Sequence, residues 1–195
     1  MINKAENRFV FVDTETGGVI PEKHSLLSIG LVIWDKKDGI IDKKEFFVKH
    51  SYYIVTEKAK EINKFEQQEH KEKALAGEEV IKNILEFIYG YFDKNTAIPL
   101  IGHNVQFDIN FLKVFFRDEN RSFNQYFSHR SIDTYSVFKS LVLAGVISDN
   151  IDSSADAFRY FDIKVNNRHS AIGDCVATVE LFEKLLLCIK RGCKE

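Results

Sequence analysis

The sequence predicts a three-layer α/β domain built on a mixed sheet, for two reasons. Near the start, three strand-like segments follow one another. The second and third are joined by a polar turn containing Asp38-Gly39, which predicts an antiparallel hairpin. Beyond it, strand-like and helix-like segments alternate, as they do where helices cover the faces of a sheet. A length of 195 residues fits one domain, residues 1–195.

The strand predictions depend on short apolar runs. Residues 9–12 (FVFV) are aromatic and β-branched in turn, which is typical of a strand buried on both faces. Residues 26–35 and 40–49 form the predicted hairpin, and residues 97–102 (AIPLIG) predict a further buried strand.

The helix predictions depend on polarity and periodicity. Residues 55–73 are charged and predict one helix with a solvated face. Residues 78–92 carry apolar residues at helical spacing. Further helices are expected over residues 104–116, 132–143, 153–161 and 170–190, with Asn104, Asp133 and Ser170 as N-caps.

Composition limits the class of protein. The hydrophobic fraction is 45% and includes 17 Phe, enough for a sizeable core, while the net charge is −2. A protein that binds long nucleic acid by charge alone is basic, so we expect any electrostatic contact with nucleic acid here to be local and to involve only a short stretch of it. The cysteines at 175, 188 and 193 match no zinc spacing. With no signal-peptide pattern and no apolar run that could span a membrane, we expect a soluble cytoplasmic protein with reduced thiols.

Two carboxylates, Asp13 and Glu15, stand at the end of the first strand and directly before Gly17-Gly18. Side chains two residues apart in a strand point to one side, so these two are about 7 Å apart along the chain. Like charges at the edge of an apolar core repel each other and lose hydration, and a hard divalent cation would account for them. A polar turn after a strand is the plainer interpretation, but it does not favour acids over Asn, Ser or Lys.

A third acid, Asp108, falls within an aromatic stripe. In the helix predicted over 104–116, it shares one face with Phe107, Phe111 and Phe115. A carboxylate there is costly unless it is paired or near a metal. We favour a metal over a salt bridge to a Lys or Arg elsewhere in the chain.

A fourth acid, Asp174, falls in the first turn of the last predicted helix, where the helix dipole favours a carboxylate. It could therefore be only a helix-start acid. His169 is five residues earlier, about 140° away around an ideal helix. We therefore expect His169 in the lead-in loop, free to reach a site that Asp174 helps to build.

Taken together, Asp13-x-Glu15, His103-Asn104-x-x-Phe107-Asp108 and His169-x-x-x-x-Asp174 resemble the motifs of the DEDDh 3′→5′ exonucleases. This family includes polymerase proofreading subunits, ribonuclease T and oligoribonuclease. The motifs occur in the family's order and cover residues 9 to about 186. The resemblance implies a ribonuclease H-like fold with a mixed five-stranded sheet flanked by helices.

The resemblance also implies a site. It implies two Mg²⁺ or Mn²⁺ ions held by the four acids, with His169 as general base. The candidates for substrate binding are Thr14, Thr16, Gly17, Val19, Asn104, Phe107 and Arg168. The family often has Thr-Gly-Leu where this chain has Gly17-Gly18-Val19, and Val19 could still wedge against a base. Plainer interpretations are a helix cap for Asn104, core packing for Phe107 and a solvated side chain for Arg168.

We therefore expect a metal-dependent 3′→5′ exonuclease that releases nucleoside 5′-monophosphates from the 3′ ends of single-stranded DNA or RNA. Three alternatives stay open: an oligoribonuclease restricted to short RNA, a catalytically silent nucleic-acid-binding module on the same fold, and a structural metal-binding domain. Clustered acids would not help a pure binder of phosphates. Association with a polymerase or a second copy is also open, although few residues follow the last predicted helix and no polymerase-binding tail is expected.

Overall fold

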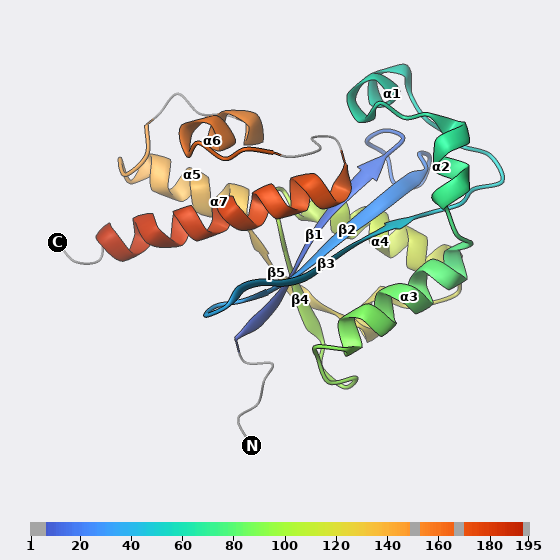
Figure 1. Ribbon diagram of the computed structural model, residues 1–195, viewed down its shortest axis with the longest axis horizontal. Helices are drawn as coiled ribbons and strands as arrows, with labels where there is room; N and C mark the ends of the chain where they lie inside the picture. The colour runs from blue at the N-terminus through green and yellow to red at the C-terminus, as the bar shows by residue number, and fades with distance from the viewer. Residues whose placement is uncertain (1–6, 149–152, 166–169, 193–195) are drawn as a thin grey trace.

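The computed structural model describes residues 7–148, 153–165 and 170–192. Its centre is a five-stranded mixed sheet in the order β3-β2-β1-β4-β5 (Figure 1). The strands are β1 (Arg8–Thr16), β2 (Leu26–Asp35), β3 (Gly39–Phe47), β4 (Ile98–Gly102) and β5 (Phe127–Asp133). The first three strands pair antiparallel, and β1, β4 and β5 pair parallel. The predicted hairpin and the mixed sheet are therefore confirmed.

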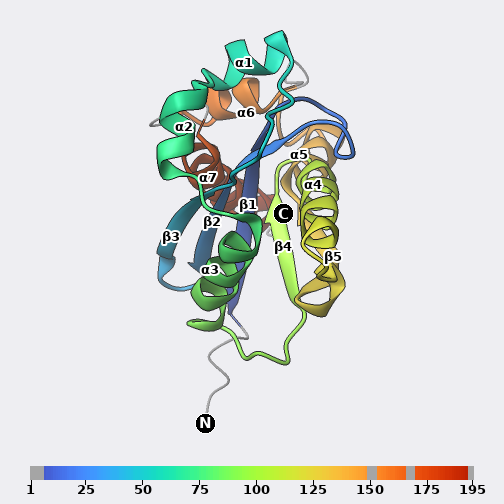
Figure 2. The same ribbon diagram turned by 90° about the vertical axis from the view of Figure 1, so that its right-hand side faces the viewer.

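Helices cover both faces of this sheet. They are α1 (Glu57–Asn63), α2 (Gln67–Lys73), α3 (Gly77–Tyr89), α4 (Gln106–Asp118), α5 (Thr134–Leu143), α6 (Ser154–Tyr160) and α7 (Ala171–Gly192), with a short 3-10 turn at Phe123–Gln125. α7 crosses one face, with α5 and α6 packed beside it, while α3 and α4 cover the other face (Figures 1 and 2). α1 and α2 stand at the end of the sheet toward which β1 runs (Figure 2). No helix in the described part of the chain is long and apolar enough to cross a membrane.

Side chains of β1 alternate between the two helical layers. Val10 and Val12 pack with residues of α3 and α4, whereas Phe11 packs with α7, and all three are almost completely buried. The alternation follows from the period of two in a strand. It continues past the apolar run, so that Asp13 and Glu15 share the face of Phe11 and α7. Thr14 points to the opposite face, toward α4.

Three elements differ from what the sequence predicted. The segment 55–73 is two helices, because the chain turns at Lys64, whose φ of 49° ends α1. The residues themselves did not predict β5, because this edge strand is half exposed and polar and has no apolar run. The helix expected from residue 132 begins two residues later, at Thr134 after β5, and Asp133 is its N-cap as predicted.

Asn104 was also predicted wrongly as a helix cap. α4 begins at Gln106, and the residue before it is Val105. Asn104 adopts a left-handed conformation with φ 58°, and its backbone N–H donates to Asp133 Oδ1 at 2.7 Å. Left-handed backbone is tolerated well by Asn, so the residue turns the chain between β4 and α4.

Candidate active site

Three carboxylates meet where β1 ends beside the start of α7. Asp13 and Glu15 come from β1, and Asp174 comes from the first turn of α7. One oxygen of each lies within 4.8 Å of the oxygens of the other two. The strand period puts the first two on the α7 face, and the chain brings Asp174 to them from more than a hundred and fifty residues away.

Burial and repulsion by neighbouring acids disfavour the ionised forms of Asp13 and Glu15. Burial, together with the charges of Asp108, Glu15 and Asp174, raises the pKa of Asp13 well above its usual range. Burial, and then the charge of Asp174, raises the pKa of Glu15 to about 8. For both Asp13 and Glu15 desolvation is the largest cause of the shift, so a positive charge beside them would stabilise their ionised forms.

The donor set fits a hard divalent cation. All three groups offer carboxylate oxygen, which is the ligand type that Mg²⁺ and Mn²⁺ prefer, and no His or Cys is among them. A cation between them would add positive charge and so favour the ionised form of each acid.

Asp108 approaches the site from the other face of the sheet. It belongs to α4, is 4% exposed, and accepts a hydrogen bond of 2.7 Å from Thr14 Oγ1. Burial raises its pKa to about 7, and the hydrogen bond from Thr14 opposes that shift. Asp108 is not one of the three converging acids. Among the described residues it forms no ion pair, so the structure offers no support for the salt-bridge interpretation.

Asp133 fixes the turn that leads to α4. Besides the Asn104 backbone, its Oδ1 accepts from the backbone N–H of Tyr135, and Ser136 Oγ donates to its Oδ2. The His103 ring lies next to this network, with Nδ1 at 3.0 Å from Thr134 Oγ1. Asp133 was predicted as a cap only, and the structure adds that it ties β4 and α4 to α5.

The remaining substrate-binding candidates differ in accessibility. Val19 is 75% exposed, whereas Thr16 is buried and donates to the Gly18 carbonyl oxygen. Gly17 has no room for a side chain, because the backbone of residue 54 packs directly against it. Phe107 is half-buried and packs on Phe111, with ring centres 5.1 Å apart.

Two candidates cannot be located. His169 and Arg168 lie outside the described residues. Their roles therefore stay predictions from the sequence.

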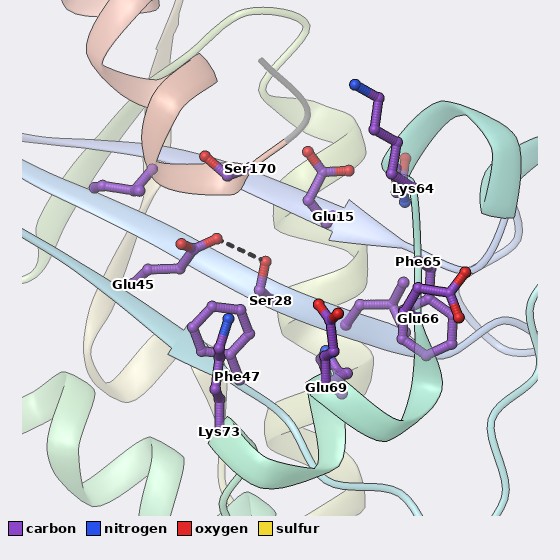
Figure 3. A pocket seen from close by; sticks show the side chains of 14 residues that line it. Glu15, Ser28, Glu45, Phe47, Lys64, Phe65, Glu66, Glu69, Lys73 and Ser170 are labelled. Carbon is purple, nitrogen blue, oxygen red and sulfur yellow. Dashed lines mark hydrogen bonds between the residues drawn. The ribbon is translucent and has the colours of Figure 1, made fainter. Parts of the chain in front are cut away.

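A cleft of about 330 Å³ adjoins Glu15, one of the three acids (Figure 3). Glu15 lies on one side, β2 and β3 form the floor, and α1 and α2 form the opposite side, with Glu66, Glu69 and Lys64 among the lining residues. Glu45 of β3 also lines it and accepts a hydrogen bond of 3.0 Å from Ser28 Oγ. The sequence analysis missed Glu45, because it lies among Asp42, Lys43 and Lys44 in a segment that resembles an ordinary exposed edge.

Comparison with known proteins identifies the family. A family model described as "Exonuclease" (RNase_T) matches residues 10–182. The chain belongs to this exonuclease family. Membership supports the predicted class of enzyme, a nuclease, and agrees with the resemblance to the DEDDh exonucleases.

Its relatives include a PolC-type DNA polymerase III and a DNA polymerase III subunit. The chain is 29% identical over 182 residues to DNA polymerase III PolC-type from Caldanaerobacter subterraneus subsp. tengcongensis. This match covers 93% of the chain and 12% of that polymerase. The chain is 24% identical over 188 residues to DNA polymerase III subunit epsilon from Aquifex aeolicus, covering 94% of this chain and 83% of that protein.

Among solved structures, E. coli Exonuclease I in complex with a dT13 oligonucleotide has the same fold. The TM-score is 0.78 at 17% identity, and the match covers 97% of this chain and 43% of that one. This chain thus spans less than half the length of Exonuclease I and a small part of the PolC-type polymerase.

Proposed function

We propose that residues 1–195 act as a single divalent-metal-dependent 3′→5′ exonuclease domain. Its substrates are the 3′ ends of single-stranded DNA or RNA, and its products are nucleoside 5′-monophosphates. The observation that carries this proposal is the convergence of Asp13, Glu15 and Asp174 oxygens within 4.8 Å, in a chain of the exonuclease family.

The acids have distinct roles in this proposal. Asp13, Glu15 and Asp174 would hold one divalent ion, and Asp108 would support a second ion from the α4 side. When bound, Mg²⁺ or Mn²⁺ supplies positive charge that stabilises the charge developing on the phosphate and the leaving 3′-oxygen.

His169 serves as the general base that takes the proton from the attacking water. Histidine suits this role because the reference pKa of an unperturbed imidazole, about 6.5, lies close to neutral pH. The sequence supports this role, since His169 precedes α7 by two residues and Asp174 by five.

The strand end next to the acids seats the terminal nucleotide. Val19 is the side chain that can wedge against a base, because it is exposed and follows the Asp13-to-Gly18 motif. Thr14 and Thr16 are buried, so the backbone of residues 14 to 17 offers the sugar contacts. Arg168 contributes a phosphate contact, with Asn104 and Phe107 on the α4 side.

A second candidate is proofreading in association with a polymerase. It is favoured by the similarity to a PolC-type polymerase and to a polymerase subunit epsilon. The chemistry at the site is the same in both cases, and only the partner differs. Co-purification with a replicative polymerase, and faster removal of a mismatched than a matched 3′ terminus, would support this candidate.

The first experiment is single-turnover digestion of matched 5′-labelled DNA and RNA oligonucleotides with Mg²⁺, Mn²⁺ or EDTA. We expect a metal-dependent ladder that shortens from the 3′ end, and the faster substrate identifies the preferred sugar. Asp13→Ala should abolish turnover. No shortening of either strand with either metal would overturn the exonuclease proposal and favour a silent binding module.

The role of His169 has its own test. His169→Ala should lower the single-turnover rate by roughly 10²–10⁴ and leave Mn²⁺ affinity close to that of the wild type. A near-normal rate in this variant would remove His169 from the mechanism without affecting the roles of the acids.

A further inference from the structure

We propose that Glu45 is a positioning residue that clamps the first turn of α7 and so holds Asp174 against β1. The inference deepens the proposed function, because it names a residue outside the family motifs on which the three-acid site depends. It follows from strand register, from the packing of α7 on β2, and from the hydrogen bonds of one carboxylate.

Strand register puts Glu45 in the same row as Asp13. Asp13 of β1 pairs with Gly30 of β2, and Gly30 pairs in turn with Glu45 of β3. Residues directly opposite one another in a sheet point to the same face. Asp13 and Glu45 therefore both face α7, with only a glycine between them.

That glycine makes room for the helix. A Cβ at Gly30 would collide with the backbone of Ala171 and Ile172, so the start of α7 lies directly on β2 at this point. The first turn of the helix thus occupies a notch with Asp13 on one side and Glu45 on the other.

Glu45 binds the helix at this notch. Ser28 Oγ donates to Glu45 Oε1 at 3.0 Å (Figure 3). Burial raises the pKa of Glu45, and the hydroxyl of Ser28 and the backbone N–H groups of Ala171 and Ile172 oppose that shift by favouring the charged carboxylate. The first N–H groups of a helix have no partners within the helix, and a carboxylate there also interacts favourably with the helix dipole. Glu45 supplies this negative charge from β3. Within the helix start itself, Ser170 Oγ accepts a hydrogen bond from the Gly173 N–H.

These contacts indicate a clamp rather than another metal ligand. The acids that converge within 4.8 Å are Asp13, Glu15 and Asp174, and Glu45 is not among them. Its carboxylate interacts with N–H and O–H donors instead. The repulsion between Glu15 and Asp174 opposes this placement of the first turn of α7, and the interactions of Glu45 with that turn counter it.

The test compares Glu45→Ala and Glu45→Gln with Glu69→Ala, which removes an acid from the α2 side of the same cleft. Amide hydrogen exchange of metal-free protein is measured over residues 171–174. Mn²⁺ affinity is measured without substrate, and kcat and KM with an oligonucleotide. Exchange needs neither metal nor substrate, so it tests the clamp even if the exonuclease proposal fails.

We expect Glu45→Ala to speed exchange at the start of α7 by about tenfold or more. We also expect it to weaken Mn²⁺ binding by roughly 10- to 100-fold and to lower kcat with little change in KM. Glu45→Gln keeps an acceptor oxygen and should restore most of the protection and affinity, and Glu69→Ala should resemble the wild type.

Two results would overturn the clamp. One is unchanged exchange at residues 171–174 in Glu45→Ala. The other is a loss of Mn²⁺ affinity in Glu45→Gln as large as in Glu45→Ala with exchange still protected, which would make Glu45 a ligand. If Glu45→Ala does not fold, Glu45→Gln and Ser28→Ala still test the clamp, since Ser28→Ala removes one of its donors and should speed exchange less than tenfold.

Discussion

Thr14 shows how one strand end can serve two faces of a sheet. Its neighbours Asp13 and Glu15 face α7, whereas Thr14 is 8% exposed and donates to Asp108 on α4. The alternation of side chains along β1 therefore puts Asp13 and Glu15 on the side of Asp174, and Thr14 on the side of Asp108. Thr14, a candidate for substrate binding in the sequence, acts in the structure as the hydrogen-bond donor to Asp108.

Thr14→Val should destabilise the protein, because it leaves the buried Asp108 carboxylate without its side-chain donor. We expect the free energy of unfolding to fall by about 1–3 kcal/mol in urea denaturation. Since the lost hydrogen bond lowers the pKa of Asp108, that pKa should rise above its wild-type value of about 7. Thr14→Ser keeps the hydroxyl and should lie close to the wild type. Equal stabilities of the Val and Ser variants would contradict this account.

The sequence singled out the acids of the candidate site, but it did not single out Glu45, which lies beside them. Asp13 and Glu15 follow from the strand period, and Asp108 stands out because it interrupts an aromatic stripe. Glu45 could not be predicted, because its role depends on the register of three strands and on where α7 crosses them. Neither appears in the local sequence.

At the element scale, turn chemistry explains the differences between prediction and structure. The charged segment 55–73 has helical composition throughout, but Phe65 must be buried with Tyr53 and His70 against β2 and β3, and the chain turns at Lys64 to achieve this. Long-range packing outweighs local helix propensity there. The edge strand β5 was missed for a related reason, since pairing with β4 rather than an apolar run defines it.

The turn at Lys64 carries a measurable strain. Lys64 has φ 49° and ψ 40°, a left-handed conformation that costs a residue with a Cβ about 1–2 kcal/mol. Lys64→Gly removes that cost but makes the unfolded chain more flexible, so we expect a net gain of about 0.5–1 kcal/mol in unfolding free energy. Lys60→Gly, within α1, is the control and should lose about 1 kcal/mol. Urea denaturation of both variants checks the prediction, and a destabilised Lys64→Gly would show that the lysine itself is needed.

At the scale of the whole molecule, the sequence predicted the architecture because its strongest signals are the buried strands of the sheet. β2 is buried along its whole length and lies between β1 and β3, so its apolar run is unmistakable. The layers then follow from the alternation of strands and helices. The same architecture explains why the acids are costly, since it brings β1, α4 and α7 together only in the folded chain.

This cost predicts how stability depends on pH. In the folded protein the pKa of Glu15 is about 8, against an ordinary value of 4.5, and the pKa values of Asp13 and Asp108 are also raised. Between these limits the folded chain holds protons that the unfolded chain has released. Without metal, the stability from these groups is thus fully present below about pH 4 and is lost as the pH rises toward 8. As the pH rises from the unfolded-state pKa of a group to its folded-state pKa, that group lowers the unfolding free energy by up to about 1.4 kcal/mol per pH unit.

Thermal unfolding in EDTA should therefore show Tm falling between about pH 5 and pH 8. Saturating Mg²⁺ or Mn²⁺ should raise Tm most at the upper end of this range, because the ion binds ionised carboxylates that only the folded chain brings together. Glu15→Gln removes the acid whose pKa is about 8, so its profile in EDTA should be flatter and its gain from metal smaller. A Tm in EDTA that does not fall over this range, or an equal gain from metal in the variant, would mean that the acids are not the group that limits stability. In that case the convergence of Asp13, Glu15 and Asp174 would have to be balanced by a cationic side chain of this protein rather than by a bound ion.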